Sequence, residues 1–138
     1  MEEITLPAPR RRLEPLCMKI GLHAIRAVVV DFYGRVQEHP RLAGPFSVVG
    51  DWDLHVERLV HYWWTVMGGL PYSDFRYALG DRHAPLGLTH ALVDDWLELF
   101  QQTLLDHVDP ELASRWHGLA MGIGESLRLM FARMEAEG

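Results

Sequence analysis

The sequence predicts a single all-α domain, and three observations carry this prediction. Apolar residues recur at steps of three and four in four long segments, the period of a helix with one buried face. Asp or Thr stands just before three of these segments, where helix N-caps occur, and Pro or Gly residues separate them. The length of 138 residues fits one domain, and no segment alternates convincingly as a strand does.

The first predicted helix covers residues 16–38, after a tail at residues 1–14 that we expect to be flexible. His39-Pro40 ends the helix, because the residue before proline is driven out of the helical conformation. Gly44-Pro45-Phe46 then predicts a turn. The apolar stripe of this helix consists of Ile20, Ala24, Ala27, Val28, Phe32 and Val36.

The second predicted helix begins after Asp51, a plausible N-cap, and stops at Gly68-Gly69 and Pro71. A short helix over Phe75–Arg82 follows and is broken at Pro85. One face of the second helix carries His55, Leu59, Tyr62, Trp63 and Val66.

Two further helices complete the prediction. Thr89 caps a helix that places Leu92, Trp96, Leu99, Phe100 and Thr103 on one face. Asp109-Pro110 supplies an N-cap and a proline at the first position of the last helix. Its stripe consists of Leu112, Trp116, Leu119, Ile123, Leu127 and Met130. Gly118, Gly122 and Gly124 each lower helix propensity by about 1 kcal/mol, and we expect them to mark a close helix approach.

Composition excludes several classes of function. The net charge of −6 argues against a general nucleic-acid surface. No stretch approaches the about 20 apolar residues of a membrane span, and the first residues lack the apolar core of a secretory signal. The single cysteine, Cys17, rules out an internal disulfide. We therefore expect a cytoplasmic protein that binds neither membrane nor nucleic acid.

Familiar site motifs are also missing. Gly122-Ile123-Gly124 follows no strand and is therefore no dinucleotide loop. Glu57 and His61 are four residues apart rather than three and have no second copy, which argues against a di-iron bundle.

Isolated histidines and aromatics are the remaining candidates. His55 points inward and His83 ends the short helix, and the commoner roles are a satisfied core histidine and a complement to the helix dipole. Tyr33 and Trp96 are by default core aromatics with satisfied polar atoms. Together, however, the four could enclose a flat, apolar macrocycle whose iron is ligated on one side and faces hydrogen-bond donors on the other.

In order and spacing, these residues resemble the truncated haemoglobins, most closely the third group of that family. The resemblance spans about residues 20–130. It rests on Phe32-Tyr33-Gly34-Arg35-Val36, Pro40, Leu42, Gly44-Pro45-Phe46, Trp52, His55, Leu59, Tyr62-Trp63-Trp64, His83, Trp96-Leu97-Glu98-Leu99-Phe100 and Glu125-Ser126-Leu127.

The resemblance implies a globin-like, two-over-two helical sandwich that holds haem b, with His83 as the iron ligand. The other ring nitrogen of His83 would donate to a backbone carbonyl near Leu79. Tyr33 and Trp96 would be distal donors to the diatomic ligand, and His55 a third donor or a gate. The cofactor-binding residues implied are Phe32, Phe46, Leu59, Trp63, Leu88 and Ile123 as apolar walls, with Arg58 and Arg82 as partners of the haem propionates.

The function implied is binding of O2, NO or CO. Redox chemistry on the ligand, such as NO dioxygenation or a peroxidase-like reaction, stays open, as do a reductase partner and a monomeric or homodimeric state. Two alternatives are a haem-free, globin-like sensor or interaction module and an unrelated helical bundle whose histidines are all structural.

Overall fold

The computed structural model of the protein describes residues 14–75 and 89–137. All regular secondary structure within these ranges is helical, which confirms the all-α prediction. The predicted tail, apart from Glu14, and the short helix predicted after Phe75 lie outside the described residues. The helices are α1 (Leu16–Ile20), α2 (Leu22–Glu38), α3 (Ala43–Phe46), α4 (Trp52–Val66), α6 (His90–His107) and α7 (Pro110–Glu137).

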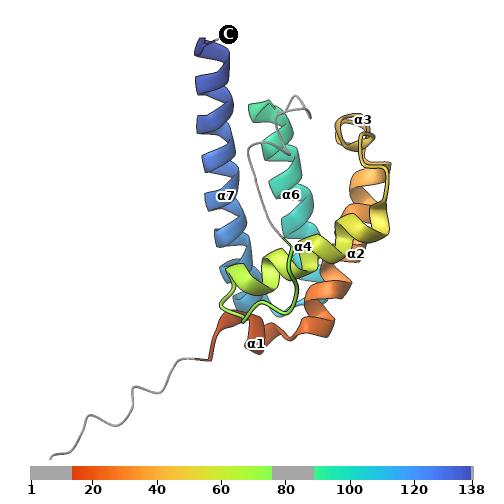
Figure 1. Ribbon diagram of the computed structural model, residues 1–138, viewed down its shortest axis with the longest axis vertical. Helices are drawn as coiled ribbons and strands as arrows, with labels where there is room; N and C mark the ends of the chain where they lie inside the picture. The colour runs from red at the N-terminus through yellow and green to blue at the C-terminus, as the bar shows by residue number, and fades with distance from the viewer. Residues whose placement is uncertain (1–13, 76–88, 138) are drawn as a thin grey trace, which may run out of the picture.

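The four long helices form two packed pairs. α6 and α7 run antiparallel side by side, and α2 packs against both α4 and α6 (Figure 1). The pair α2 and α4 thereby covers the pair α6 and α7, as the two-over-two globin arrangement predicts. The C-terminal turns of α7 extend past the start of α6 (Figure 1). Within the described ranges, no helix is both long enough and apolar enough to cross a membrane.

The predicted helix starts are confirmed by side-chain caps. The Asp51 carboxylate accepts a hydrogen bond from the Leu54 N–H at 3.0 Å, and the Thr89 hydroxyl accepts one from the Leu92 N–H at 3.2 Å. The Asp109 carboxylate likewise accepts the N–H of Glu111 at 3.0 Å. Each cap satisfies a backbone donor that has no partner within the helix. Three of the four long helices therefore begin where a local signal in the sequence places them.

The prediction of one continuous helix over residues 16–38 is wrong. The helix breaks at Gly21, whose φ of 89° lies in the left-handed region that glycine adopts without strain. Apolar spacing alone did not reveal this break, because the buried stripe resumes in α2 with nearly the same register. Gly44-Pro45-Phe46, predicted as a turn, belongs to the one-turn helix α3.

The prediction from the three glycines of α7 is confirmed at one position only. A Cβ added at Gly124 would lie 3.1 Å from Val93 Cγ1 and 3.2 Å from Leu97 Cδ1, so α6 approaches closely there. Nothing lies within 4 Å of a Cβ added at Gly118 or Gly122. Close packing therefore explains Gly124 and does not explain the other two.

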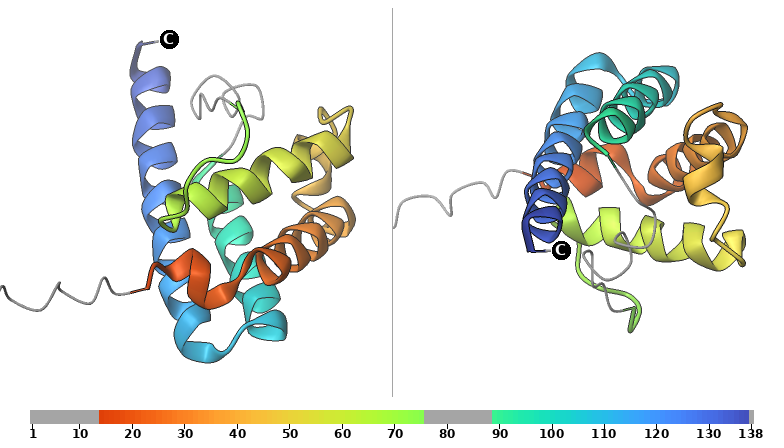
Figure 2. Two further views of the ribbon diagram at one scale, coloured as in Figure 1. Left: turned by 60° about the horizontal axis from the view of Figure 1, so that its bottom comes forward. Right: turned by 90° about the horizontal axis from the view of Figure 1, so that it is seen from above.

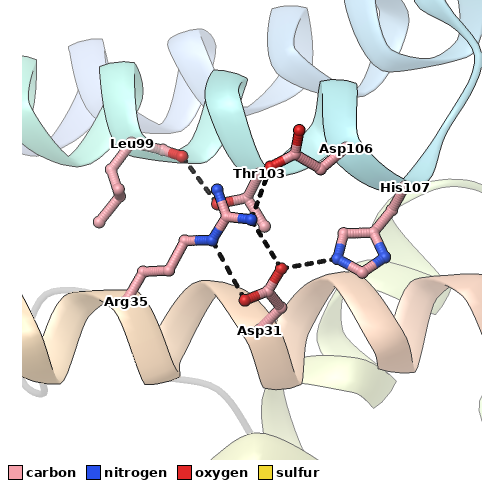
Figure 3. Close-up of polar contacts among 6 residues, drawn as sticks. All are labelled: Asp31, Arg35, Leu99, Thr103, Asp106 and His107. Atoms are coloured by element: carbon pink, nitrogen blue, oxygen red, sulfur yellow. Dashed lines mark hydrogen bonds and ion pairs between the residues drawn. The ribbon is translucent and has the colours of Figure 1, made fainter.

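A polar cluster joins α2 to α6 (Figure 3). Asp31 accepts two hydrogen bonds from Arg35 at 3.1 and 2.9 Å, and the His107 ring nitrogen lies 2.7 Å from the same carboxylate. Arg35 also donates to Asp106 at 2.6 Å. Burial acts to raise the pKa of Asp31, but the bonds from Arg35 and His107 outweigh it, so the pKa is lowered.

The glycines of α7 give a first prediction. Gly118→Ala and Gly122→Ala are each expected to stabilise the protein by up to about 1 kcal/mol, because alanine is the better helix former. Gly124→Ala is expected to gain less or to destabilise, because its methyl group would press on Val93 and Leu97. Urea unfolding of the three variants measures this, and an equal gain at all three positions would contradict the close approach.

The Asp31 cluster gives a prediction about pH. The pKa of Asp31 in the folded state lies below its unfolded value of about 3.9, so the carboxylate stabilises the fold above that pH. This contribution is lost as the pH falls through the folded pKa. Asp31→Asn is expected to lower stability at pH 7 by no more than about 1 kcal/mol, since the pair is solvent-screened, and the deficit should shrink below about pH 4.

Unfolding at pH 7 and pH 3 checks this, with Glu38→Gln, an exposed carboxylate on the same helix, as the control. A deficit that persists undiminished in acid would show that Asp31 acts through something other than its charge.

Candidate functional site

Tyr33 and Trp96 meet where α2 packs against α6. The Tyr33 side chain is buried inside an aromatic cluster, and this burial raises the pKa of its phenol far above the usual value. The nearby Trp96 side chain acts in the opposite direction and lowers this pKa. The indole N–H of Trp96 can only donate a hydrogen bond, whereas the Tyr33 hydroxyl can both donate and accept one.

His55 lies on the same side of the cluster as Tyr33. Its ring centroid is 5.5 Å from that of Tyr33 and 5.5 Å from that of Trp52, edge-on in both cases. Phe46, from α3, closes the group at 6.0 Å from Tyr33. The prediction that His55 faces inward is confirmed, and its role as donor or gate stays a prediction.

An apolar stack lies behind these polar groups. Trp96 stacks on Phe100 with ring centroids 5.7 Å apart, and Phe100 stacks on Trp63 at 5.6 Å. Phe32 meets Phe100 edge-on at 4.9 Å and is fully enclosed. The quadrupoles of aromatic rings favour stacked and edge-on arrangements, so these contacts restrict the position of the Trp96 ring.

Two of the predicted wall residues border this core rather than fill it. Leu59 of α4 and Ile123 of α7 are both partly buried and pack against the core. Such half-covered apolar side chains suit contact with the face of a flat, apolar ligand. Their contact with haem stays a prediction.

Arg58, predicted to pair with a haem propionate, has its guanidinium carbon 5.4 Å from the centre of the Phe75 ring. This is a cation–π contact between α4 and the segment that follows it. A guanidinium on an aromatic face still presents N–H groups to a carboxylate, and the pairing of Arg58 with a haem propionate stays a prediction.

The predicted iron ligand, His83, lies outside the described residues, as do Leu79, Arg82 and Leu88. No group of three His, Cys, Asp or Glu side chains suited to a metal ion occurs among the residues that the structure does describe. Haem iron needs a single proximal side chain, and the porphyrin supplies the other in-plane ligands. The donor set of Tyr33, Trp96 and His55 within an aromatic surround suits haem rather than a bare metal ion.

Sequence reasoning assigned no site role to two residues that the structure places in this cluster. Trp52 lies 5.8 Å from Tyr33 between ring centroids, and Phe100 links Trp96 to Trp63. Trp52 precedes His55 by three residues and Phe100 follows Trp96 by four, so helical spacing could have indicated both.

A model of the family described as bacterial-like globin matches residues 16–120 of the chain. The matched range holds helices α1, α2, α3, α4 and α6, the start of α7, and the segment that carries His83. The chain matches no curated protein closely enough to count as a relative.

Proposed function

The chain belongs to the bacterial-like globin family, and on this basis we propose that it holds haem b through His83 and binds a diatomic ligand beside Tyr33 and Trp96. The observation that carries the proposal is the burial of the Tyr33 phenol in an aromatic cluster that also holds Trp96 and His55. Polar groups buried in an aromatic core have a cost in desolvation free energy. A ligand that accepts hydrogen bonds from these groups would offset that cost.

When bound, haem supplies an iron on which O2, NO or CO can be held. The residues of this chain then decide how firmly the ligand stays. Tyr33, with Trp96 beside it, donates its O–H to the ligand, and a fixed donor in a dry site stabilises developing negative charge far better than water does. His55, edge-on to Tyr33, stands where a third donor or a gate would act.

Two strong donors favour retention of the ligand over its release. We therefore expect redox chemistry on the held ligand, such as NO dioxygenation or a peroxidase-like reaction with a reductase partner, rather than oxygen transport. The burial of Tyr33 favours this, because its raised pKa keeps the phenol protonated and able to donate throughout the physiological range.

Haem binding is the first prediction from this proposal. The purified protein should be red, with a Soret band that shifts on addition of carbon monoxide. His83→Ala should lose most of its haem, because the imidazole that coordinates the iron is removed. His23→Ala, which removes an exposed histidine of α2, should retain it. A colourless wild type that takes up no added haem would favour the haem-free module instead.

Tyr33→Phe gives the second prediction. Hydrogen bonds to a charged acceptor contribute about 1.5–3 kcal/mol each, so removing the phenol oxygen should speed O2 dissociation by about tenfold or more. Stopped-flow displacement of O2 by CO measures the rate. If the rate is unchanged while haem is retained, Tyr33 does not face the ligand.

A further inference from the structure

The connection between α2 and α4, residues 39–50, packs over Tyr33, and we call it the α3 segment. Seen from above in Figure 2, it joins the end of α2 to the start of α4 on the side of the molecule remote from α7. Two of its side chains, Leu42 and Phe46, are buried in the core, and the Phe46 ring lies against that of Tyr33. Its other residues are exposed or half-buried. Two side chains therefore supply most of its apolar contact with the core.

The α3 segment has little regular structure to stabilise it. The helix α3 is a single turn whose first residue receives no side-chain cap, and its main contacts among the helices are with α2. The Phe46 N–H donates to the Leu42 carbonyl at 3.1 Å and the Ala43 N–H to the His39 carbonyl at 3.0 Å, both within the segment. Elements with few buried contacts open at low free energy. Of the chain that covers Tyr33, this segment is the part that opens most easily.

An ion pair fastens the α3 segment to α6. Arg41 Nε lies 2.6 Å from one carboxylate oxygen of Asp95, and Arg41 Nη2 lies 2.8 Å from the other. Only 12% of the Asp95 side chain is exposed, against 64% of that of Arg41, so the guanidinium reaches an enclosed carboxylate from the solvent side. The bonds from Arg41 lower the pKa of Asp95. Since Asp95 directly precedes Trp96, the pair is made beside the candidate site.

His39 sets the turn from which Arg41 projects. Its Nδ1 accepts the N–H of Arg41 at 3.1 Å and the N–H of Leu42 at 3.2 Å. A ring nitrogen that accepts carries no proton, so these bonds require the hydrogen on Nε2. They hold two neighbouring residues in opposite roles, because Leu42 enters the core while Arg41 stays exposed and turns to α6.

We propose that the α3 segment is a lid over the ligand site and that the Arg41–Asp95 ion pair is its latch. When the pair opens, the segment is free to carry Phe46 away from Tyr33 and uncover the phenol to a small ligand from solvent. An exposed guanidinium readily exchanges its carboxylate partner for water, so the latch can open without disturbing the core. The inference rests on the proposed function, because it takes Tyr33 to face the ligand. It is separate from a gating role of His55, which lies on α4.

The test uses the full-length protein. Arg41→Gln and Asp95→Asn each break the latch from one side, and the double variant shows whether both act through the same pair. Arg26→Gln is the matched control, because it breaks another bidentate pair, made with Glu57 at 3.1 and 3.0 Å between α2 and α4. Exchange of the Phe46 amide hydrogen reads the opening of α3 with or without haem. Rebinding of CO after flash photolysis, measured as the bimolecular rate, reads ligand entry.

Arg41→Gln and Asp95→Asn should each speed Phe46 amide exchange and CO association about two- to fivefold, the range of a partly exposed ion pair. The double variant should be no faster than the faster single variant, and Arg26→Gln should match wild type. High salt should speed both processes in wild type and leave the double variant unchanged. Because the Arg41 side chain is exposed, Arg41→Gln keeps the core intact even if Asp95→Asn does not fold.

Three outcomes overturn the inference. Phe46 exchange in Arg41→Gln equal to that in Arg26→Gln, or effects that add in the double variant, would show that the pair is no latch. Faster exchange with unchanged CO association would show that the α3 segment opens without controlling ligand entry. A wild type that binds no haem would overturn the proposed function and the role in ligand entry, whereas Phe46 exchange would still show whether the latch exists.

Discussion

A tyrosine hydroxyl inside an aromatic core must find its hydrogen-bond partners without water, and this constraint organises the molecule around Tyr33. Trp96, whose indole N–H can only donate, lies near this phenol. Phe100 and Trp63 stack in series behind Trp96. The contact of α2 with α6 therefore packs the core and also brings two polar side chains together.

α4 serves the site from two sides. Its inner face brings His55 against Tyr33, and its outer face holds the returning chain through His61 and Trp64. The bidentate pair of Arg26 with Glu57, at 3.1 and 3.0 Å, ties the same helix to α2. Since that ion pair is well exposed, it fixes register more than it adds stability. One helix thus connects the distal donors with the segment that leads to the predicted iron ligand.

Features that depend on neighbouring residues could be predicted from the sequence. Asp51, Thr89 and Asp109 indicate helix starts because a capping side chain bonds a backbone N–H two or three residues ahead, and the structure confirms all three. The break at Gly21 escaped prediction because the buried stripe continues across it. The burial of His61 could not be predicted from helical periodicity, because periodicity describes a single helix. The residues that cover His61, Tyr72 and Phe75, come from the segment after α4. Tyr33 and Trp96 are 63 positions apart and lie on different helices, so helical periodicity alone could not show that they lie close together.

The central claim is that Tyr33 and Trp96 form one donor unit that faces the ligand, and the infrared C–O stretch of the carbon monoxide complex tests it most directly. Positive dipoles aimed at the ligand lower this frequency, and the account predicts a band that moves upward in Tyr33→Phe. Trp96→Phe should move it in the same direction, because the indole N–H donor beside Tyr33 is lost. A band that stays in place in both variants would contradict the account.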